Sequence, residues 1–466
     1  CSGSATYSGR LESSRLARNA DSSDIFDELR KQDTSLAAMS SVEQSARVAP
    51  REVSLVIRNA AELATPLGNT PRLGAALAQI QLLPEPLVAI DGERIVAIGP
   101  QRELGERFVG RVELDARRGT LVPGFVDAHT HPVFATTRED EFELRTRGAS
   151  YAEIAAAGGG ILSTTRGVRA ASQAELEERL SGHLARFVEH GTTTVEAKSG
   201  YGLSVDDELK CLRAIAAVRA RSELDLAPTF LGAHDYPLEH RADKPAYVRA
   251  ILEEMLPRVA AEGLAEYCDV FTETIAFSLE DSRRILERAR ELGLGLRMHV
   301  DQLTPLGGAE LAAELGAASA DHLEHVSERG IERLRASGVV AVLCPVVPLF
   351  LRQSVEAPGR KLIDAGVAVA ISTDFNPGSC YLPSMPEVCS WAALRYRMSA
   401  AECLSAATLN AACSLGRGGE LGSLEVGKRA DVVVLDAPNH KHLVYELGRN
   451  PVRAVVARGR LVRSRG

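Results

Sequence analysis

The sequence Leu-Val-Pro-Gly-Phe-Val-Asp-Ala-His-Thr-His, residues 121–131, begins as an apolar run and ends with two histidines two positions apart. Its first half is typical of a buried strand. If the whole stretch continues as a strand, the side chains of His129 and His131 point to the same side, because side chains alternate along a strand. Both imidazoles can then reach one metal ion. A His-x-His pair is a weak signal alone, since its meaning depends on its structural context.

That context is a series of short apolar, β-branched runs along the middle of the chain. After the first run at 121–126, seven more cover residues 192–196, 226–231, 267–271, 294–300, 318–323, 339–343 and 367–371. Helical periodicity separates most of them, over residues 173–189, 206–221, 245–261 and 279–292. Eight strands that alternate with helices predict an α/β fold, a TIM-like (β/α)8 barrel.

Both ends of the chain show short alternating strands instead. They cover residues 53–59, 87–91, 94–98 and 112–115 near the start, and 431–435 and 452–461 near the end. We predict a small composite β-sandwich domain, built from residues 51–120 and 421–466, beside a catalytic barrel of residues 121–420. Residues 1–50 are polar, lack an apolar period and are interpreted as a disordered leader or tag.

Bulk composition excludes several classes of partner. The net charge is -8 and the basic residues form no block, so nucleic acid is not expected to bind. The longest apolar runs, such as residues 339–347, fall short of the roughly 20 residues that cross a bilayer, so no membrane span is expected. Eight dispersed cysteines without a CxxC pair predict reduced core residues of a cytoplasmic protein, rather than disulfides or a structural zinc cluster.

Polar residues at the strand ends are the candidates for chemistry, because barrel active sites lie at the C-terminal ends of the strands. These residues are Asp127, His129, His131, Lys198, Ser199, Tyr201, His234, Glu273, His299, His322, Asp374 and Asn376. Two histidines after the first run, His299 after the fifth and Asp374 after the eighth predict a zinc or ferrous iron site with a position left for water. Alternatively, His299 is a core histidine and Asp374 caps a turn. Five other histidines are interpreted as solvated or structural: His183, His190, His240, His440 and His442.

Several of these motifs resemble a known enzyme family. Residues 123–131 are similar to the opening signature of the amidohydrolase superfamily. More particular matches follow at residues 157–161, 196–203, 232–234, 299–302 and 372–378, and among these Lys-Ser-Gly-Tyr-Gly-Leu and Asp-Phe-Asn-Pro are the most specific. Over residues 53–462 the chain resembles the imidazolonepropionases of histidine degradation.

The resemblance implies an amidohydrolase-type barrel that hydrolyses the cyclic amide 4-imidazolone-5-propanoate to N-formimidoyl-L-glutamate. It implies one Zn or Fe ion held by His129, His131, His299 and Asp374, with Asp374 and His322 as catalytic residues. A metal-bound hydroxide attacks the ring carbonyl, and the C–N bond then breaks. The substrate-binding positions implied by the family are Arg138, Tyr201, His234, Gln302, Asn376, Gly378 and Ser379. The family also implies a cytoplasmic homodimer with a small-molecule substrate.

Other interpretations stay open. A related deaminase would act on a nucleobase-like heterocycle, but such enzymes carry Glu three residues after the fifth-strand histidine, where this chain has Gln302. A catalytically silent barrel is the other alternative, although all four predicted ligands are present. Arg138 can pair with the acidic residues 139–141 on a solvated face, and Lys198 can be a carbamylated bridge between two metals.

Overall fold

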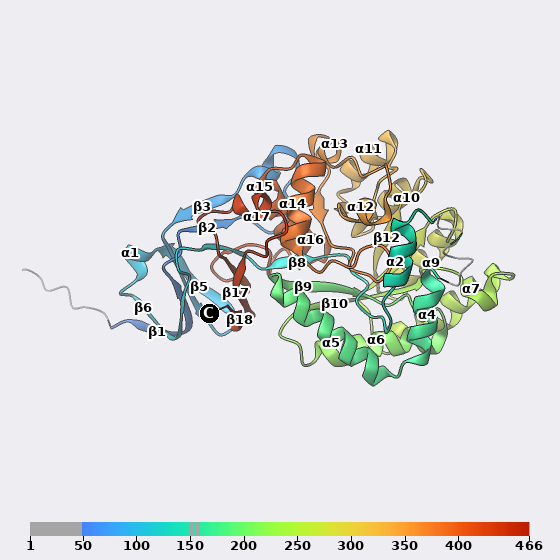
Figure 1. The fold of residues 1–466 in the computed structure, drawn as a ribbon, viewed down its shortest axis with the longest axis horizontal. Helices are drawn as coiled ribbons and strands as arrows, with labels where there is room; N and C mark the ends of the chain where they lie inside the picture. The colour runs from blue at the N-terminus through green and yellow to red at the C-terminus, as the bar shows by residue number, and fades with distance from the viewer. Residues whose placement is uncertain (1–48, 150–152, 154–158, 466) are drawn as a thin grey trace, which may run out of the picture. The chain divides into compact units, whose positions relative to one another are not determined.

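The computed structural model describes residues 49–149, 153 and 159–465, so the predicted leader lies almost wholly outside it, as do residues 157 and 158 of the glycine-rich motif. Eight parallel strands form one sheet in chain order (Figure 1). They are β8 (Phe125–Asp127), β9 (Thr192–Lys198), β10 (Asp225–Ala233), β11 (Tyr267–Thr272), β12 (Gly295–Val300), β13 (Ser319–His322), β14 (Val340–Leu343) and β15 (Val369–Ile371). Just beyond the two edge strands, Thr130 bridges Phe375 in parallel. The predicted barrel is confirmed.

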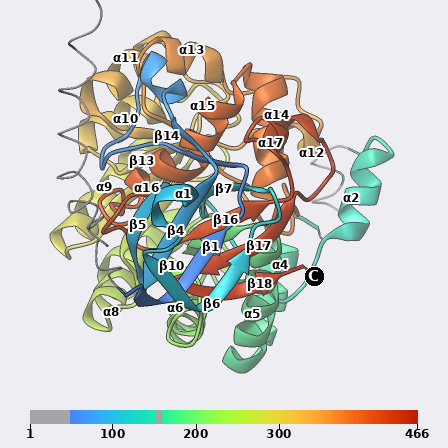
Figure 2. The same ribbon diagram turned by 90° about the vertical axis from the view of Figure 1, so that its left-hand side faces the viewer.

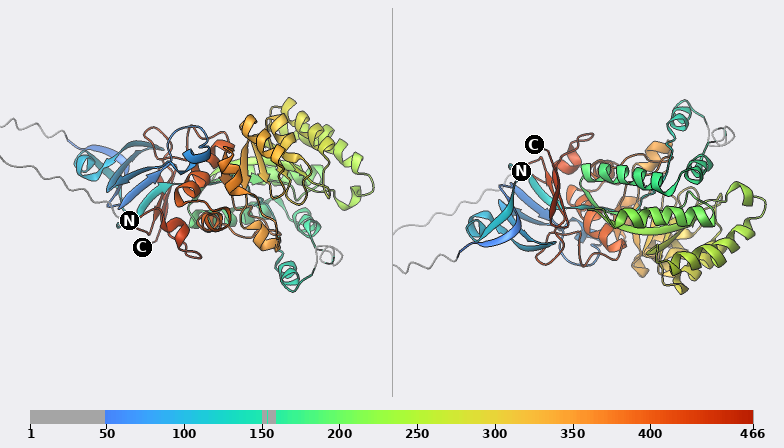
Figure 3. Two further views of the ribbon diagram at one scale, coloured as in Figure 1. Left: turned by 90° about the horizontal axis from the view of Figure 1, so that it is seen from above. Right: turned by 90° about the horizontal axis from the view of Figure 1, so that it is seen from below.

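Helices flank the barrel strands in both views of Figure 3. They include α2 (Glu139–Thr146), α4 (Ile161–Ala170), α5 (Gln173–Glu189), α6 (Val205–Arg219), α9 (Leu279–Glu291), α10 (Gly308–Leu315), α11 (Glu328–Ser337), α13 (Gly359–Asp364) and α14 (Met385–Tyr396). Helix α5 begins at a capping box of Ser172 and Glu175. None of the helices in the described ranges is both long and apolar enough to cross a membrane.

The helix predicted at 245–261 is interrupted. A π-helical turn, η4 (Ile251–Met255), separates α7 (Lys244–Ala250) from α8 (Leu256–Ala261). Pro257 lies in the first turn of α8, and a proline has no N–H to bond the carbonyl four residues earlier. The periodicity therefore predicts the helix but not the bulge inside it.

The strands of the two chain ends form two further sheets (Figure 2), and in one of them strands from both ends lie side by side, which confirms the composite domain. One sheet has the order β5 (Arg94–Pro100), β4 (Pro86–Asp91), β1 (Arg51–Arg58) and β6 (Phe108–Asp115). The other has the order β18 (Arg460–Ser464), β17 (Val452–Ala457), β16 (Val432–Leu435), β7 (Thr120–Pro123), β2 (Glu62–Thr65) and β3 (Gln81–Pro84). The domain limits at residues 120 and 420 stay a prediction.

The run predicted as one strand at 121–126 is two strands in different sheets. Strand β7 pairs with β16 of the composite domain, and β8 opens the barrel. Gly124 separates them where a Cβ atom would lie 2.2 Å from the Thr193 hydroxyl oxygen, so a side chain does not fit where the chain changes sheets. The seven cysteines that the structure describes are free, and six of them are buried, as predicted for core residues.

Asp127 connects the first and last barrel strands. Its buried carboxylate accepts hydrogen bonds from Thr373 N at 3.0 Å and Thr373 Oγ1 at 2.6 Å, and from the Ser372 hydroxyl. We expect Asp127→Ala to lower the free energy of unfolding by about 3 kcal/mol, because buried donors lose a charged acceptor. Urea unfolding measures this change. The control is Asp115→Ala, an exposed aspartate at the end of β6, and an equal loss in both variants would contradict the prediction.

Candidate active site

A cavity of about 1050 Å³ opens at the C-terminal ends of the barrel strands. The family resemblance implied twelve residues for metal binding, catalysis or substrate binding. Eleven of them line this cavity: His131, Arg138, Tyr201, His234, His299, Gln302, His322, Asp374, Asn376, Gly378 and Ser379. The twelfth, His129, is fully buried next to them. His183, His190, His240, His440 and His442 do not line this cavity.

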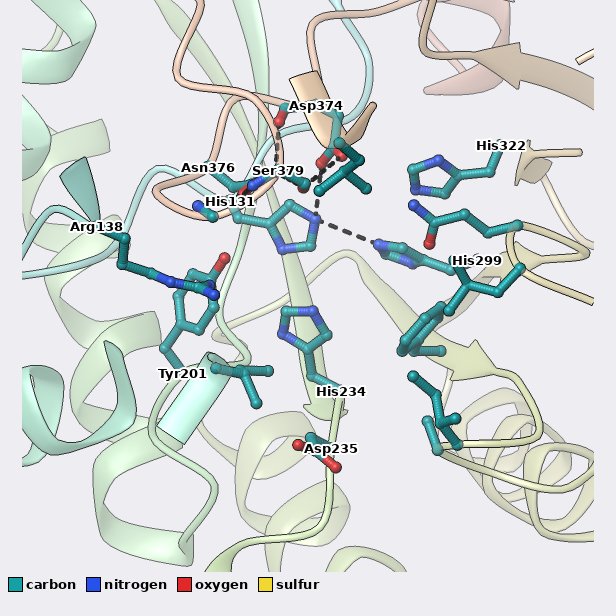
Figure 4. Close-up of a pocket in the computed structure, with 18 of the residues that line it drawn as sticks. His131, Arg138, Tyr201, His234, Asp235, His299, His322, Asp374, Asn376 and Ser379 are labelled. Carbon is teal, nitrogen blue, oxygen red and sulfur yellow. Dashed lines mark hydrogen bonds and ion pairs between the residues drawn. The ribbon is translucent and has the colours of Figure 1, made fainter. Parts of the chain in front are cut away.

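Three imidazoles and one carboxylate, from His129, His131, His299 and Asp374, converge at the floor of this cavity. Figure 4 shows His131, His299 and Asp374. His131 Nε2 lies 3.4 Å from His129 Nε2 and 3.2 Å from His299 Nε2. Asp374 Oδ1 lies 3.3 Å from His131 Nε2 and 3.5 Å from His129 Nε2. Four ligand atoms about 2 Å from a tetrahedral zinc ion have similar mutual separations.

The assumption that one strand continues to His131 is wrong. Strand β8 ends at Asp127, and both histidines lie in the segment that follows. Hydrogen bonds to the segment after β15 hold it instead, since Asp374 N donates to the His129 carbonyl at 3.1 Å and His131 N to the Phe375 carbonyl at 2.9 Å. These bonds and the bridge of Thr130 with Phe375 hold both histidines beside Asp374.

Two nearby carboxylates determine which ring nitrogen carries the proton in two of these imidazoles. His129 Nδ1 lies 2.6 Å from Asp321 Oδ2, and His299 Nδ1 lies 3.0 Å from Asp269 Oδ1. Each carboxylate accepts the Nδ1 proton, so the Nε2 atom carries a lone pair. Burial lowers the pKa of His299 to about 3 and those of His129 and His131 well below the usual value, which keeps the rings neutral.

A metal ion therefore fits these residues. The Nε2 lone pairs of His129 and His299 lie 3.4 and 3.2 Å from His131 Nε2, and a cation between these atoms would be stabilised by all three rings. Asp374 Oδ1 is buried beside them and has no hydrogen-bond partner, which is costly for a carboxylate oxygen. Three nitrogens and one carboxylate are a ligand set that suits zinc or iron.

Sequence analysis missed Asp269 and Asp321. Both are fully buried inside strands, Asp269 in the middle of β11 and Asp321 just before His322 in β13. Neither lies at a strand end: Asp269 reaches His299 from the neighbouring strand, and Asp321 reaches His129 across the barrel. A charged residue within an apolar strand is the signal that would have found them.

Two catalytic candidates have a strained backbone. Asp374 has a φ of 49° and His322 a φ of 80°, in the left-handed region that residues with a side chain rarely adopt. His322 Nδ1 lies 3.8 Å from Glu324 Oε1. Burial opposes a charge on His322, but Glu324, Asp374 and Asp321 outweigh it and raise the pKa of His322 to about 9.

Arg138 lies on the far side of the cavity from His322 (Figure 4). Its Nε and Nη2 atoms lie 2.8 and 2.6 Å from Glu141 Oε2. The ion pair considered as an alternative is thus present, yet the guanidinium also lines the cavity. A Cβ atom on Gly378 would lie 2.1 Å from Arg138 Nη1, so the guanidinium rests directly against this glycine.

Tyr201 and His234 complete this side of the cavity. The His234 ring stacks on the His131 ring with centroids 5.0 Å apart, and its Nδ1 lies 2.9 Å from the Gly200 carbonyl oxygen. The Tyr201 ring lies 5.2 Å from that of His234. Burial lowers the pKa of His234 to about 3 and raises the pKa of Tyr201, so both side chains are neutral.

Comparison with known proteins identifies this kind of site. A model of the amidohydrolase family matches residues 120–462. The imidazolonepropionase of Symbiobacterium thermophilum is 49% identical over 89% of this chain and 99% of its own length. The chain belongs to the imidazolonepropionases of the amidohydrolase family. The imidazolonepropionase of Thermoanaerobacter pseudethanolicus is 44% identical, over 87% of this chain and 97% of the relative.

Solved structures share the fold of this imidazolonepropionase family member at much lower identity. An adenosine deaminase from Xanthomonas campestris with bound zinc has a TM-score of 0.66 at 22% identity, over 88% of this chain and 93% of that one. The E. coli guanine deaminase has a TM-score of 0.67 at 17% identity, over 88% and 99% of the two chains. These similarities concern the fold alone.

Two of the residues predicted at strand ends, Asn376 and Glu273, use most of their polar atoms in hydrogen bonds within this imidazolonepropionase fold. The Asn376 amide accepts hydrogen bonds from Gly378 N and Ser379 N and donates to the Asp374 carbonyl and Ser379 Oγ, at 2.7 to 2.8 Å. Glu273 accepts from Leu303 N at 2.7 Å and Thr304 Oγ1 at 2.6 Å. Asn376 thus shapes the turn after Asp374, and Glu273 holds the loop next to Gln302.

Proposed function

We propose that the chain hydrolyses 4-imidazolone-5-propanoate to N-formimidoyl-L-glutamate in L-histidine catabolism. The observation that carries this proposal is the convergence of three imidazoles and Asp374 at the floor of a cavity that also holds the Arg138 guanidinium. The relatives' shared name supports the same substrate. A homodimer and a cytoplasmic location, both expected from the family, stay predictions.

We infer that His129, His131, His299 and Asp374 would hold one Zn or Fe ion. Such an ion, when bound, lowers the pKa of a water molecule to roughly 7 and polarises a carbonyl oxygen. Imidazole and carboxylate ligands serve both metals, so the proposal covers both.

Asp374 and His322 divide the proton chemistry between them. Asp374 accepts a proton from the attacking water and returns it to the ring nitrogen as the C–N bond breaks. His322 donates a hydrogen bond to the carbonyl oxygen, where negative charge develops as the water oxygen adds to the carbonyl carbon. Gln302 has no titratable proton and acts by orienting the water or the ring.

The other side of the cavity binds the propanoate tail and the ring. A planar guanidinium pairs with a carboxylate through two hydrogen bonds, and Glu141 fixes the orientation of Arg138 for this contact. The protonated Tyr201 hydroxyl donates a further hydrogen bond, and the backbone at Gly378 and Ser379 closes the subsite around the carboxylate. The neutral His234 ring stacks on the imidazolone ring, and Asn376 keeps this turn in shape.

Gly378→Ala tests the carboxylate subsite. The added methyl group would displace the end of the Arg138 side chain, so we expect kcat/KM to fall about 10- to 100-fold, mainly through KM, with little change in stability. Initial rates over a range of substrate concentrations measure this. The control is Gly182→Ala on α5, where a Cβ atom meets nothing within 4 Å. An unchanged KM in Gly378→Ala would show that Arg138 does not bind the substrate carboxylate.

The function itself is tested by offering the purified chain imidazolone propanoate, adenine and guanine in parallel. We expect the ring absorbance of imidazolone propanoate to disappear without release of ammonia. Ammonia released from a nucleobase, without ring opening of imidazolone propanoate, would instead establish a deaminase. A chain that opens no ring and retains no stoichiometric metal would be the silent scaffold.

A further inference from the structure

A buried lysine lies inside the barrel beneath the cavity. Lys198 Nζ, at the end of β9, lies 2.8 Å from Glu196 Oε1 and 2.7 Å from Asp269 Oδ2, and all three side chains are fully buried. Burial alone would lower the pKa of Lys198, but the charges of Asp269 and Glu196 raise it above its usual value. A buried ammonium is costly unless carboxylates surround it in this way. The amine is therefore engaged in ion pairs, unlike the uncharged amine that carbamylation requires.

Each carboxylate that contacts Lys198 also holds part of the candidate metal site. Glu196 Oε2 accepts a hydrogen bond from Thr130 N at 3.1 Å, between His129 and His131. Asp269 Oδ1 accepts from His299 N at 3.2 Å and lies 3.0 Å from His299 Nδ1. One ammonium thus connects the segment after β8 to the histidine on β12.

We propose that Lys198 is a positioning residue that aligns His299 with the His129–His131 segment through Asp269 and Glu196. This inference rests on the metal site proposed above. Metal affinity requires ligand atoms held to within about 0.5 Å. The segment after β8 is held to Phe375 by the bridge at Thr130, whereas its alignment with His299 depends on Glu196 and Asp269. Without the ammonium, Asp269 and Glu196 repel each other, and the orientation of His299 is lost.

Zinc affinity, measured by chelator competition on the full chain, tests this role. Lys198→Met removes the charge and keeps a side chain of similar length. We expect about a 10- to 100-fold higher dissociation constant for Zn²⁺, the usual effect of losing support for a metal ligand. The matched control is Arg429→Met, which breaks a buried ion pair with Asp431 (2.6 Å) and with Asp225 (3.0 Å) at the start of β10, the end opposite the cavity. This control should keep wild-type zinc affinity.

A second variant separates positioning from stability, because Lys198→Met leaves the buried Glu196 with only the more distant Arg297, whose Nε lies 4.0 Å from Glu196 Oε1. Glu196→Gln/Lys198→Met removes this poorly compensated charge, so we expect the free energy of unfolding to recover while zinc affinity stays low. Zinc affinity that recovers together with stability would overturn the proposal, and so would wild-type affinity in Lys198→Met.

His299→Ala, measured in parallel, distinguishes this inference from the proposed function. If His299→Ala loses zinc while Lys198→Met binds it normally, the positioning role alone is wrong. If His299→Ala binds zinc as the wild type does, the ligand set is wrong and the positioning role falls with it. We expect His299→Ala to lose zinc and Lys198→Met to bind it weakly.

Discussion

Asp374→Asn is expected to lower kcat for ring opening by about 10³-fold. Asparagine keeps the shape of the side chain but removes the negative charge that faces His131 and His129 and the oxygen that accepts the proton of the attacking water. An amide oxygen is a weaker metal ligand than a carboxylate oxygen, but it can still bind a metal ion. We therefore expect the metal content per chain to fall less steeply than kcat. Initial rates at saturating substrate, together with metal content per chain, measure both effects.

The control for this variant is Asp364→Asn at the end of α13, where an exposed carboxylate pairs with Arg360. It makes the same chemical change away from the cavity and should leave kcat within about twofold of the wild type, since it touches neither substrate nor ligands. A kcat above one tenth of the wild-type value in metal-loaded Asp374→Asn would show that another group takes the proton.

His299→Ala is expected to remove stoichiometric metal and, with it, ring-opening activity to below about 10⁻³ of the wild-type rate. The variant deletes an Nε2 atom that lies 3.2 Å from His131 Nε2 and leaves Asp269 without its histidine partner. Chelation of the wild-type chain should give the same inactive state, and added Zn²⁺ should restore the wild type but not the variant.

His183→Ala provides the matched comparison for that experiment. His183 is also buried, and its Nδ1 lies 2.8 Å from the Pro132 carbonyl oxygen, but it does not line the cavity. This variant should lose stability and keep its metal. Metal retained by His299→Ala would exclude His299 as a ligand.

The fold was predictable because eight apolar runs follow one another along the chain and helical periodicity separates most of them. The expected helix at 173–189 has the bounds of α5, since Ser172 and Glu175 cap it and the apolar residues of its buried side recur at helical spacing. The run at 121–126 was misjudged because β7 and β8 are equally apolar. Only their pairing partners distinguish the two strands, and the partner of β7 lies at Val432–Leu435.

The candidate site was predictable only as far as strand ends could be located. The rule that barrel strands end on one face was enough to group His129, His131, His299 and Asp374. The roles of Asp269 and Lys198 depend on contacts between different strands, which spacing along one strand does not encode. The contact of Arg138 with Gly378 likewise joins distant parts of the chain, so local charge suggested only the pair with Glu141.

During synthesis, β7 cannot pair with β16 until the ribosome has made the residues between the two strands. Thr120 Oγ1 donates to the Ala437 carbonyl, 317 residues further along the chain. At about 5 to 20 residues per second, a ribosome needs roughly 15 to 60 s to make that interval. Throughout this period β7 lacks its partner β16, although only β8 separates it from the histidine segment. The nascent chain therefore cannot assemble its complete active enzyme during translation of the barrel, and completion waits for the last strands.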